Sequence, residues 1–324
     1  MGGSSATTDS EEEEIGQAEG KQSGEEARRT DLADPTTLDD EYRVAVAAGN
    51  PETIEQLTRT AADLARYEGG SVLVVSVAVQ PRGSPFALMR DEVIKRDLSA
   101  HRRAVLDRAI TVAGEAGVEV GARMVVARSV ADGILNVIAE EDPDLILLGW
   151  SGRSPTDAVL GTNLDRIVAR SRCDVLVEKL GPGIETVDSI LLPVVESPHT
   201  WLASQVATAI ADANGAEIEA LHVVEPGHED DAASDLLAEV ATAIGPDIVR
   251  THIESGSSPV EAIVAAAERH DLTIMGATRS GPLQRRLVGS TPRRVGRQLD
   301  ETVIIARRPG ESPRRLPFPR IPWP

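Results

Sequence analysis

The chain has 324 residues, which at about 100–200 residues per domain predicts two domains. Its 41% of hydrophobic residues excludes a chain that is disordered throughout, and its 2% of aromatic residues argues against nucleic-acid binding by base stacking. The formal net charge of −19 repels phosphate backbones and anionic lipid, so we expect neither nucleic acid nor a membrane surface as a general partner.

Residues 1–41 are predicted to form a disordered acidic tail, because Ser, Gly, Thr and Glu dominate them and Glu11–Glu14 is a run of like charge. Strands and helices alternate from residue 42 onward. Arg43–Ala48 is predicted as a short apolar strand, and Thr53–Tyr67 as a helix with one apolar face. The other elements expected in this unit are strand Ser71–Val79, helix Val93–Ala116, strand Val118–Ala127, helix Val130–Glu141, strand Asp144–Gly149, helix Asn163–Ser171 and strand Asp174–Glu178.

The same order of elements then begins again, which indicates an internal repeat. Asp144–Gly149 matches Asp271–Gly276 at an offset of 127 residues, and Gly161-Thr162 matches Gly289-Ser290 at an offset of 128, so two separate stretches indicate the repeat. The elements expected in the second unit are strand Ser189–Val195, helix Trp201–Ala213, strand Glu217–Val224, helix Ala232–Ile244, strand Ile248–Glu254, helix Val260–His270, strand Leu272–Gly276, helix Pro292–Leu299 and strand Thr302–Ala306.

Two βα repeats of the same length and order predict an α/β fold with two tandem, doubly wound, five-stranded parallel sheets. We assign the first domain to residues 42–180 and the second to residues 187–307. Residues 308–324 are rich in Pro and Arg, and they are predicted to form a second disordered tail. The alternative is a segment that docks on a partner or on an anionic membrane surface.

The loop after the fourth strand of each repeat is the candidate binding site, because ligands of open α/β sheets lie beyond the carboxyl ends of the strands. Its glycines let the backbone approach a phosphate, and the following helix offers free N–H groups. The alternative is that Ser290 only caps its helix and the glycines only form turns. The candidate residues are Gly149, Gly152, Gly161 and Thr162 in the first copy, and Gly276, Arg279, Gly289 and Ser290 in the second.

The five-strand unit, the glycine loop after strand four and the duplication together resemble the universal stress protein (UspA-like) family over about residues 43–306. The segments Gly256–Pro259 and Ile190–Val194 add local matches. The resemblance implies an adenine nucleotide alpha hydrolase-like, Rossmann-like fold with strand order 3-2-1-4-5. It also implies two subclasses, one that binds ATP and one that does not.

The ATP-binding subclass has Gly-x-x-Gly, a spacer, Gly-Ser/Thr, and an Asp that ends strand one. At that Asp position this chain has Ala48 in the first copy and Val195 in the second, with Glu196 one residue later. Arg279 replaces the second loop glycine of the second copy, and the spacer of the first copy is one residue short. These departures remove the adenosine-side carboxylate and alter the phosphate loop.

The second loop is strongly cationic. Six arginines and no acid lie between Gly276 and Arg297, whereas the matching stretch Gly149–Arg170 has three arginines against Asp157 and Asp165. A cationic loop at a helix N-terminus suits an anion, and Arg279 could form a fork with a phosphate. The alternative is that these arginines pair with acids of the partner domain or of the N-terminal tail.

Other chemistry has little support in the sequence. The six histidines are scattered without metal-binding spacing, so we expect no metal site. His222 and His252 are interpreted as packed or hydrogen-bonded residues, and Cys173 as a buried apolar residue. We expect no catalytic residue, and an ATP-hydrolysing enzyme is the weakest of three hypotheses.

The first hypothesis is a regulatory protein that binds ATP or another adenine nucleotide, with Mg²⁺ if the ligand requires it, through the second copy. The second is an adaptor that binds no nucleotide and regulates a partner such as a membrane transporter, since the resemblance implies such attached domains. It also implies that the two domains pair through the last strands, Asp174–Glu178 and Thr302–Ala306, which would cover two open sheet edges. A homodimer of the two-domain unit remains possible.

We expect a cytoplasmic chain without a membrane span, because Val72–Val79 is among the longest apolar runs and the N-terminus is acidic. Only three of the 33 basic residues are Lys, which together with the many acids indicates a halophilic source. A GC-rich genome is the alternative explanation for this preference for Arg.

Overall fold

The computed structural model describes residues 42–49, 51–79, 91–150, 162–181, 186–227, 231–277 and 289–309. The N-terminal tail, most of the C-terminal tail and most of both glycine loops lie outside these ranges. Predictions on those segments therefore remain predictions.

The first repeat contains the nine elements that the sequence predicts, with small shifts at their ends. They are β1 (Arg43–Ala47), α2 (Pro51–Glu68), β2 (Ser71–Val79), α3 (Asp91–Glu115), β3 (Glu119–Ala127), α4 (Val130–Glu141), β4 (Leu145–Trp150), α5 (Thr162–Arg170) and β5 (Asp174–Lys179).

The second repeat has the same order of elements. They are β6 (Ser189–Pro193), α6 (Pro198–Asn214), β7 (Glu217–Val224), α7 (Asp231–Ile244), β8 (Val249–Ser255), α8 (Pro259–Ala267), β9 (Leu272–Gly276), α9 (Ser290–Gln298) and β10 (Thr302–Arg307). Helix α6 begins three residues before its predicted start, because Ser197 accepts the N–H of His199 as N-cap and Pro198 suits the first turn.

The strands form one ten-stranded sheet with the order β3-β2-β1-β4-β5-β10-β9-β6-β7-β8. Each half has the expected order 3-2-1-4-5 and is parallel throughout. The halves join where β5 pairs antiparallel with β10, with Ile304 opposite Glu178. Pairing through the last strands is thus confirmed, and it merges the two predicted sheets into one.

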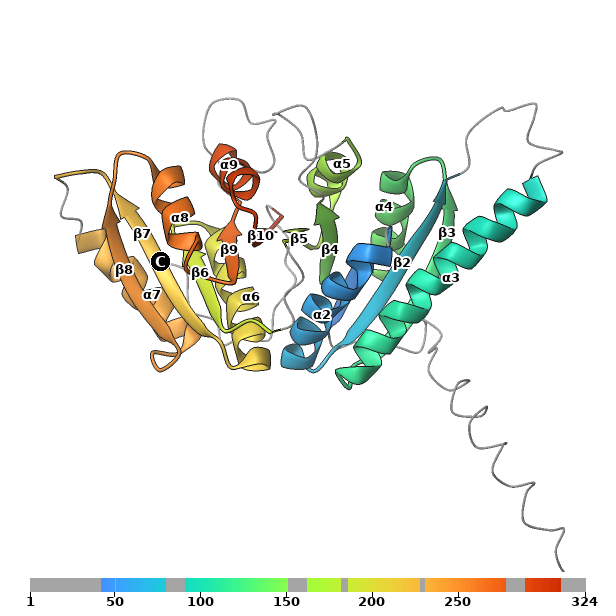
Figure 1. The fold of residues 1–324 in the computed structure, drawn as a ribbon, viewed down its shortest axis with the longest axis horizontal. Coiled ribbons are helices and arrows are strands. Elements are labelled where there is room, and N and C mark those ends of the chain that lie inside the picture. The colour runs from blue at the N-terminus through green and yellow to red at the C-terminus, as the bar shows by residue number, and fades with distance from the viewer. Residues whose placement is uncertain are drawn as a thin grey trace, which may run out of the picture.

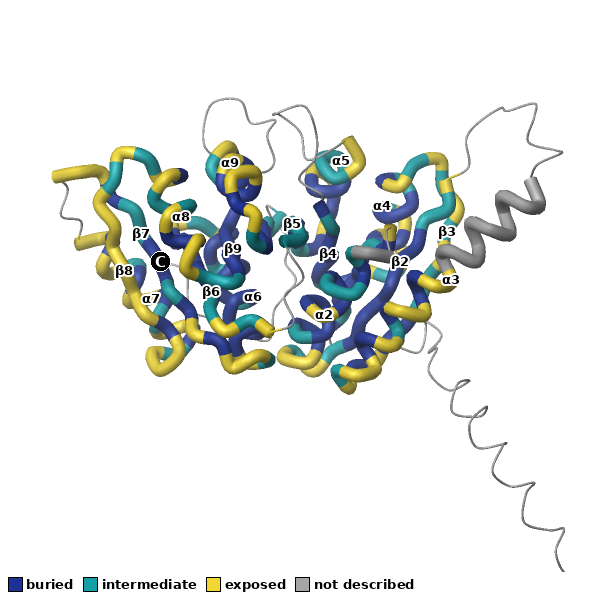
Figure 2. Tube along the Cα trace, viewed as in Figure 1, coloured by how far each residue is buried: buried dark blue, intermediate teal, exposed yellow. Residues whose placement is uncertain are grey.

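Helices cover both faces of this sheet (Figure 1). Helices α2, α3, α6 and α7 lie along the lower side of the view, and α4, α5, α8 and α9 lie along the upper side. Each face has one hydrophobic core that runs through both domains and consists mainly of Val, Ile, Leu and Ala, as the composition predicts. Figure 2 shows the central strands buried and the outward surfaces of the helices exposed.

A repeated aspartate explains the sequence match between the two fourth strands. Asp144 precedes β4 and accepts the backbone N–H of Arg43 at the start of β1, with an N···O distance of 2.9 Å. Asp271 precedes β9 and accepts the backbone N–H of Ser189 at the start of β6, also at 2.9 Å. Both carboxylates therefore fix the first and fourth strands together at their amino ends, away from the candidate site.

The junction of the domains, which we call the seam, consists of β5, β10 and the helices beside them. Helix α2 packs on α6 across it, where the Asn214 amide contacts the Asp63 carboxylate at 3.3 Å. On the opposite face of the sheet, the ring of Trp150 lies against Gly296 of α9. Arg308 forms an ion pair with Asp174 at 3.2 Å at the start of β5.

Gly181 lies two residues after the end of β5, where the backbone of the first domain comes close to that of the second. A Cβ added there would lie 2.6 Å from the backbone nitrogen of Thr302 and 2.7 Å from the carbonyl carbon of Glu301. Because backbone atoms cannot rotate away, we expect Gly181→Ala to lower the free energy of unfolding by about 2 kcal/mol or more in urea denaturation.

The matched control is Gly114→Ala in α3, where an added Cβ meets no atom within 4 Å. Alanine is the better helix former, so this variant should be stabilised by about 0.5–1 kcal/mol. Equal effects of the two substitutions would contradict a close backbone approach at Gly181.

Candidate functional site

The candidate sites lie at the carboxyl ends of β1 and β4 in the first domain and of β6 and β9 in the second, where the strand order reverses. Gly149, Thr162, Gly276, Gly289 and Ser290 belong to the described residues. Gly152, Gly161 and Arg279 lie outside them, as do Arg285 and Arg286, so their part in the site stays a prediction.

In the first domain, the end of β4 packs tightly on α2. A Cβ added at Gly149 would lie 3.0 Å from Cδ1 of Leu57, a side chain that is itself buried. Ala48 follows β1, is buried, and donates its backbone N–H to the Val75 carbonyl at 2.8 Å. The carboxyl end of β1 therefore presents a small apolar side chain where the family pattern has a carboxylate.

The charged groups beside this first site neutralise one another. Ser129 caps α4 by accepting the Asp132 N–H, and its hydroxyl donates to the Asp132 carboxylate at 2.7 Å. Arg166 of α5 pairs with that same carboxylate at 2.5 Å. Asp165 adds a negative charge to the first turn of α5, where the N–H groups point.

In the second domain, the first turn of α6 lies against the end of β9. A Cβ at Gly276 would lie 2.8 Å from both the His199 carbonyl carbon and the Thr200 nitrogen, so only glycine permits this approach. The Thr200 hydroxyl donates to the Val195 carbonyl at 2.6 Å, which fixes the turn after β6. Val195 and Glu196 are exposed there.

The start of helix α9 does not match the interpretation in which Ser290 caps the helix. Gly289 occupies the N-cap position without any side-chain hydrogen bond, and Ser290 is the first helical residue, with an exposed side chain. The cap assignment to Ser290 is therefore wrong. The first turn of α9 contains no acid, whereas that of α5 contains Asp165, so α9 retains N–H groups that no cap side chain accepts.

The arginines of α9 divide between the two interpretations. Arg293 is buried, and its guanidinium lies 3.8 Å from the Asp165 carboxylate of α5, so it pairs with the partner domain as the ion-pair alternative predicts. Arg294 and Arg297 are exposed on the same helix. Helices α5 and α9, which each follow one candidate loop, are thus linked to each other by charge.

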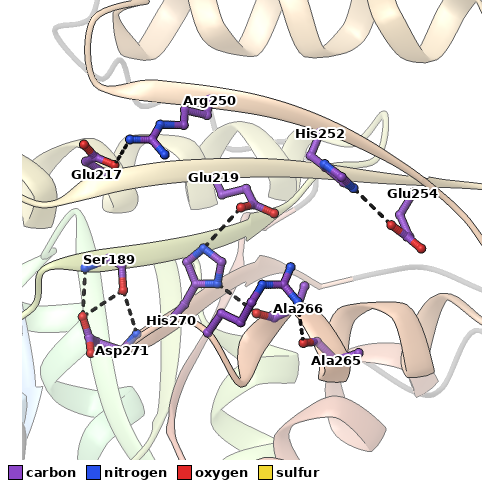
Figure 3. Close-up of polar contacts among 11 residues, drawn as sticks. Ser189, Glu217, Glu219, Arg250, His252, Glu254, Ala265, Ala266, His270 and Asp271 are labelled. Atoms are coloured by element: carbon purple, nitrogen blue, oxygen red, sulfur yellow. Dashed lines mark hydrogen bonds and ion pairs between the residues drawn. The ribbon is translucent and has the colours of Figure 1, made fainter.

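The remaining candidate side chains have structural partners. His222 Nδ1 lies 2.8 Å from the Val194 carbonyl, which confirms its interpretation as a hydrogen-bonded residue. In Figure 3, His252 contacts Glu254 at 3.1 Å and His270 contacts Glu219. Cys173 is buried, and burial raises the pKa of its thiol to about 12, so it is no nucleophile at neutral pH.

Within the described ranges, no group of three or more His, Cys, Asp or Glu side chains is placed to hold a metal ion. Two features of the seam escape the sequence analysis: the stacking of Trp150 on Gly296, and Glu178, a fully buried carboxyl. The sequence does contain a signal for Glu178, because it is a charged residue inside a strand expected to pair between domains.

The described strands and helices define a pair of doubly wound α/β domains. The model of the universal stress protein family matches residues 42–179 and 227–307, and the chain belongs to that family. A universal stress protein from Archaeoglobus fulgidus is 21% identical, with a TM-score of 0.56 over 82% of this chain and 96% of that one.

Two further likenesses involve transport proteins. The cytoplasmic domain of a prokaryotic cation chloride cotransporter is 14% identical, with a TM-score of 0.56 over 82% of this chain and 95% of that domain. The Na⁺/H⁺ antiporter NhaS5 of Synechocystis is 28% identical over 185 residues, which are 56% of this chain but only 26% of the antiporter. The chain thus matches about a quarter of that relative's length. Among the described helices, none has the length and apolar character to cross a membrane.

The ion pair between Asp165 and Arg293 yields a test of the link between α5 and α9. We expect Asp165→Asn to reduce the free energy of unfolding by about 1 kcal/mol, because it leaves a buried guanidinium without its carboxylate. A double-mutant cycle with Arg293→Met, measured by urea denaturation, separates the coupling from the effect of Asp165 on its own helix.

The matched control is Glu217→Gln, which removes the ion pair with Arg250 on the edge of the sheet. Both side chains of that pair are more than half exposed, so the change should stay below about 0.5 kcal/mol. A coupling energy near zero for Asp165 and Arg293 would contradict the link.

Proposed function

We propose that this chain is a regulatory protein of the universal stress family that binds an adenine nucleotide at the carboxyl edge of its second domain. The observation that carries the proposal is the start of α9, which lacks both a cap side chain and an acid in its first turn. The corresponding helix of the first domain has Asp165 at that place. The start of α9 is therefore better suited to bind an anion than the start of α5, and we favour the second copy as the nucleotide site.

The phosphates are proposed to lie at the N-terminus of α9. Uncapped N–H groups and the helix dipole favour an anion there, and the exposed hydroxyl of Ser290 can donate to a phosphate oxygen. Gly276 brings β9 close to α6, and Arg279 in the loop is proposed as a guanidinium ligand of the phosphate. Mg²⁺ would accompany a triphosphate.

The adenosine is proposed to bind without the carboxylate of the family pattern. Ala48 and Val195 occupy the strand ends where that carboxylate would lie, and Glu196 is the nearest acid in the second copy. We therefore expect weaker selection for the ribose hydroxyls than for the phosphates, so that ATP, ADP and AMP differ mainly through their charge.

The proposal predicts that ATP raises the thermal midpoint of the wild-type protein and that Ser290→Asp abolishes this shift. At about 100 times its Kd, a ligand stabilises the folded state by about 2.7 kcal/mol, which a thermal melt detects readily. An aspartate at Ser290 suits a helix start but repels phosphate, so the fold should persist while binding is lost.

Thr162→Asp is the matched control, since Thr162 is the first residue of α5 and aligns with Ser290. This variant should keep the full shift with ATP. Equal loss in both variants would contradict the preference for the second copy, and no shift with any adenine nucleotide would contradict nucleotide binding altogether.

The second candidate function is regulation of a membrane transporter by direct contact. The similarity to part of the Na⁺/H⁺ antiporter NhaS5 supports this candidate. We propose that the chain acts as a separate or attached regulatory domain on the cytoplasmic side of a cation transporter. Cross-linking in intact cells followed by mass spectrometry should then identify a multi-spanning cation transporter, and recovery of water-soluble partners alone would contradict it.

A further inference from the structure

The seam contains a carboxyl group that the nucleotide site does not use. Glu178 is the last residue but one of β5, lies opposite Ile304 of β10, and has an exposed fraction of 0%. Helix α2 contacts the strand there through Gln56, and the antiparallel partner strand belongs to the other domain. A carboxylate in such a place is costly unless a cation or several hydrogen bonds stabilise it.

Neutral groups surround Glu178. The Gln56 amide donates to its Oε1 at 2.9 Å, and the Thr60 hydroxyl also bonds to this carboxyl. The Gln56 amide also donates to the Thr302 hydroxyl across the seam at 3.1 Å. In the described part of the chain, Oε2 of Glu178 is buried and has no hydrogen-bond partner.

No cation compensates the charge of Glu178 in the described structure. Lys179 donates instead to the Leu299 carbonyl, and Arg308 pairs with Asp174 at the far end of β5. Asp63 of α2, a second carboxyl, acts on Glu178 by like-charge repulsion. Its own partners are the neutral amide of Asn214 on α6 and, through their charge, Arg59 and Arg66. On the sheet itself, Glu178 lies beside Gly149 of β4 and Ile304 of β10, which carry no charge.

We propose that Glu178 is a proton-binding site built into the seam, and that loss of its proton loosens the pairing of β5 with β10. With its proton, the carboxyl is a neutral group among neutral partners. Without it, a charge lies between the domains, and the protein lowers the cost by separating the strands so that water reaches Oε2. This inference goes beyond the proposed function, because it requires no nucleotide.

The direction of the pH dependence follows from burial. Burial raises the pKa of Glu178 to about 7 from an ordinary value of 4.5, and Asp63 strengthens the effect. The folded seam thus binds the proton more tightly than the opened seam does. The stabilisation is complete below about pH 4.5 and is lost as the pH rises through 7. Asp63 contributes in the same direction, since burial raises its pKa to about 6.

The test is hydrogen exchange of the wild-type chain at pH 6 and pH 8, corrected for the intrinsic effect of pH. With a pKa of about 7 when closed and 4.5 when open, Glu178 raises the opening constant of the seam about tenfold over this interval. Asp63, with a pKa of about 6 when closed, adds a factor of about two, so the wild-type rise is about twentyfold in all. We expect that rise in peptides covering residues 174–179 and 302–307. Peptides covering β2, in the middle of the first domain, serve as the internal reference and should change far less.

The variant Glu178→Gln keeps the shape of the side chain and cannot titrate. In it, the rise should shrink to about twofold, which is the share expected from Asp63 with a pKa of about 6. Glu119→Gln on the exposed start of β3 is the matched control and should retain the full wild-type rise.

An unchanged rise in Glu178→Gln would overturn the proposal. So would an equal rise in β2, because the proton would then stabilise the whole fold and not the seam. If the variant fails to fold, the pH-dependent rise of the seam peptides compared with that of β2 in the wild-type chain still tests the proposal.

Discussion

The antiparallel pairing of β5 with β10 is the interaction on which the rest of this structure depends. It covers one sheet edge of each βα repeat, and it makes ten strands into one sheet. The two hydrophobic cores then continue from one domain into the other. The positions of α5 against α9 and of α2 against α6 follow from this pairing, so the candidate binding edges are held in a fixed relation.

Much of this architecture was predictable from the sequence, because each element has a strong local signal. Near-continuous Val and Leu runs such as Ser71–Val79 indicate buried parallel strands, and the match of Asp144–Gly149 with Asp271–Gly276 reveals the duplication. The pairing of the last strands was available only through the family resemblance. A local pattern shows that a strand is buried, but it does not show which partner covers its edge.

The candidate site was less predictable, because its details depend on geometry. Ser290 is of a residue type that often caps helices, yet Gly289 occupies the N-cap position. A difference of one residue in where the helix begins decides which of the two is the cap. Arg293 could be counted among cationic groups from the sequence, but its pairing with Asp165 requires the position of a helix in the other domain. Glu178 shows the same limit. The sequence shows a charged residue in the strand, but only the assembled seam shows that the described residues around it are neutral or acidic.

The fusion of both copies into one chain has a consequence for the chemistry of the seam. In the aligned last strands, Asp174–Lys179 and Thr302–Arg307, the residue that corresponds to Glu178 is Ala306. A symmetric pair of separate chains would bury such a carboxyl twice, and two like charges would have to be neutralised together. The tandem chain buries it once, so only one of the two paired strands carries an ionisable carboxyl at this position. Gene duplication followed by divergence thus permits an asymmetry that no homodimer of identical subunits can encode.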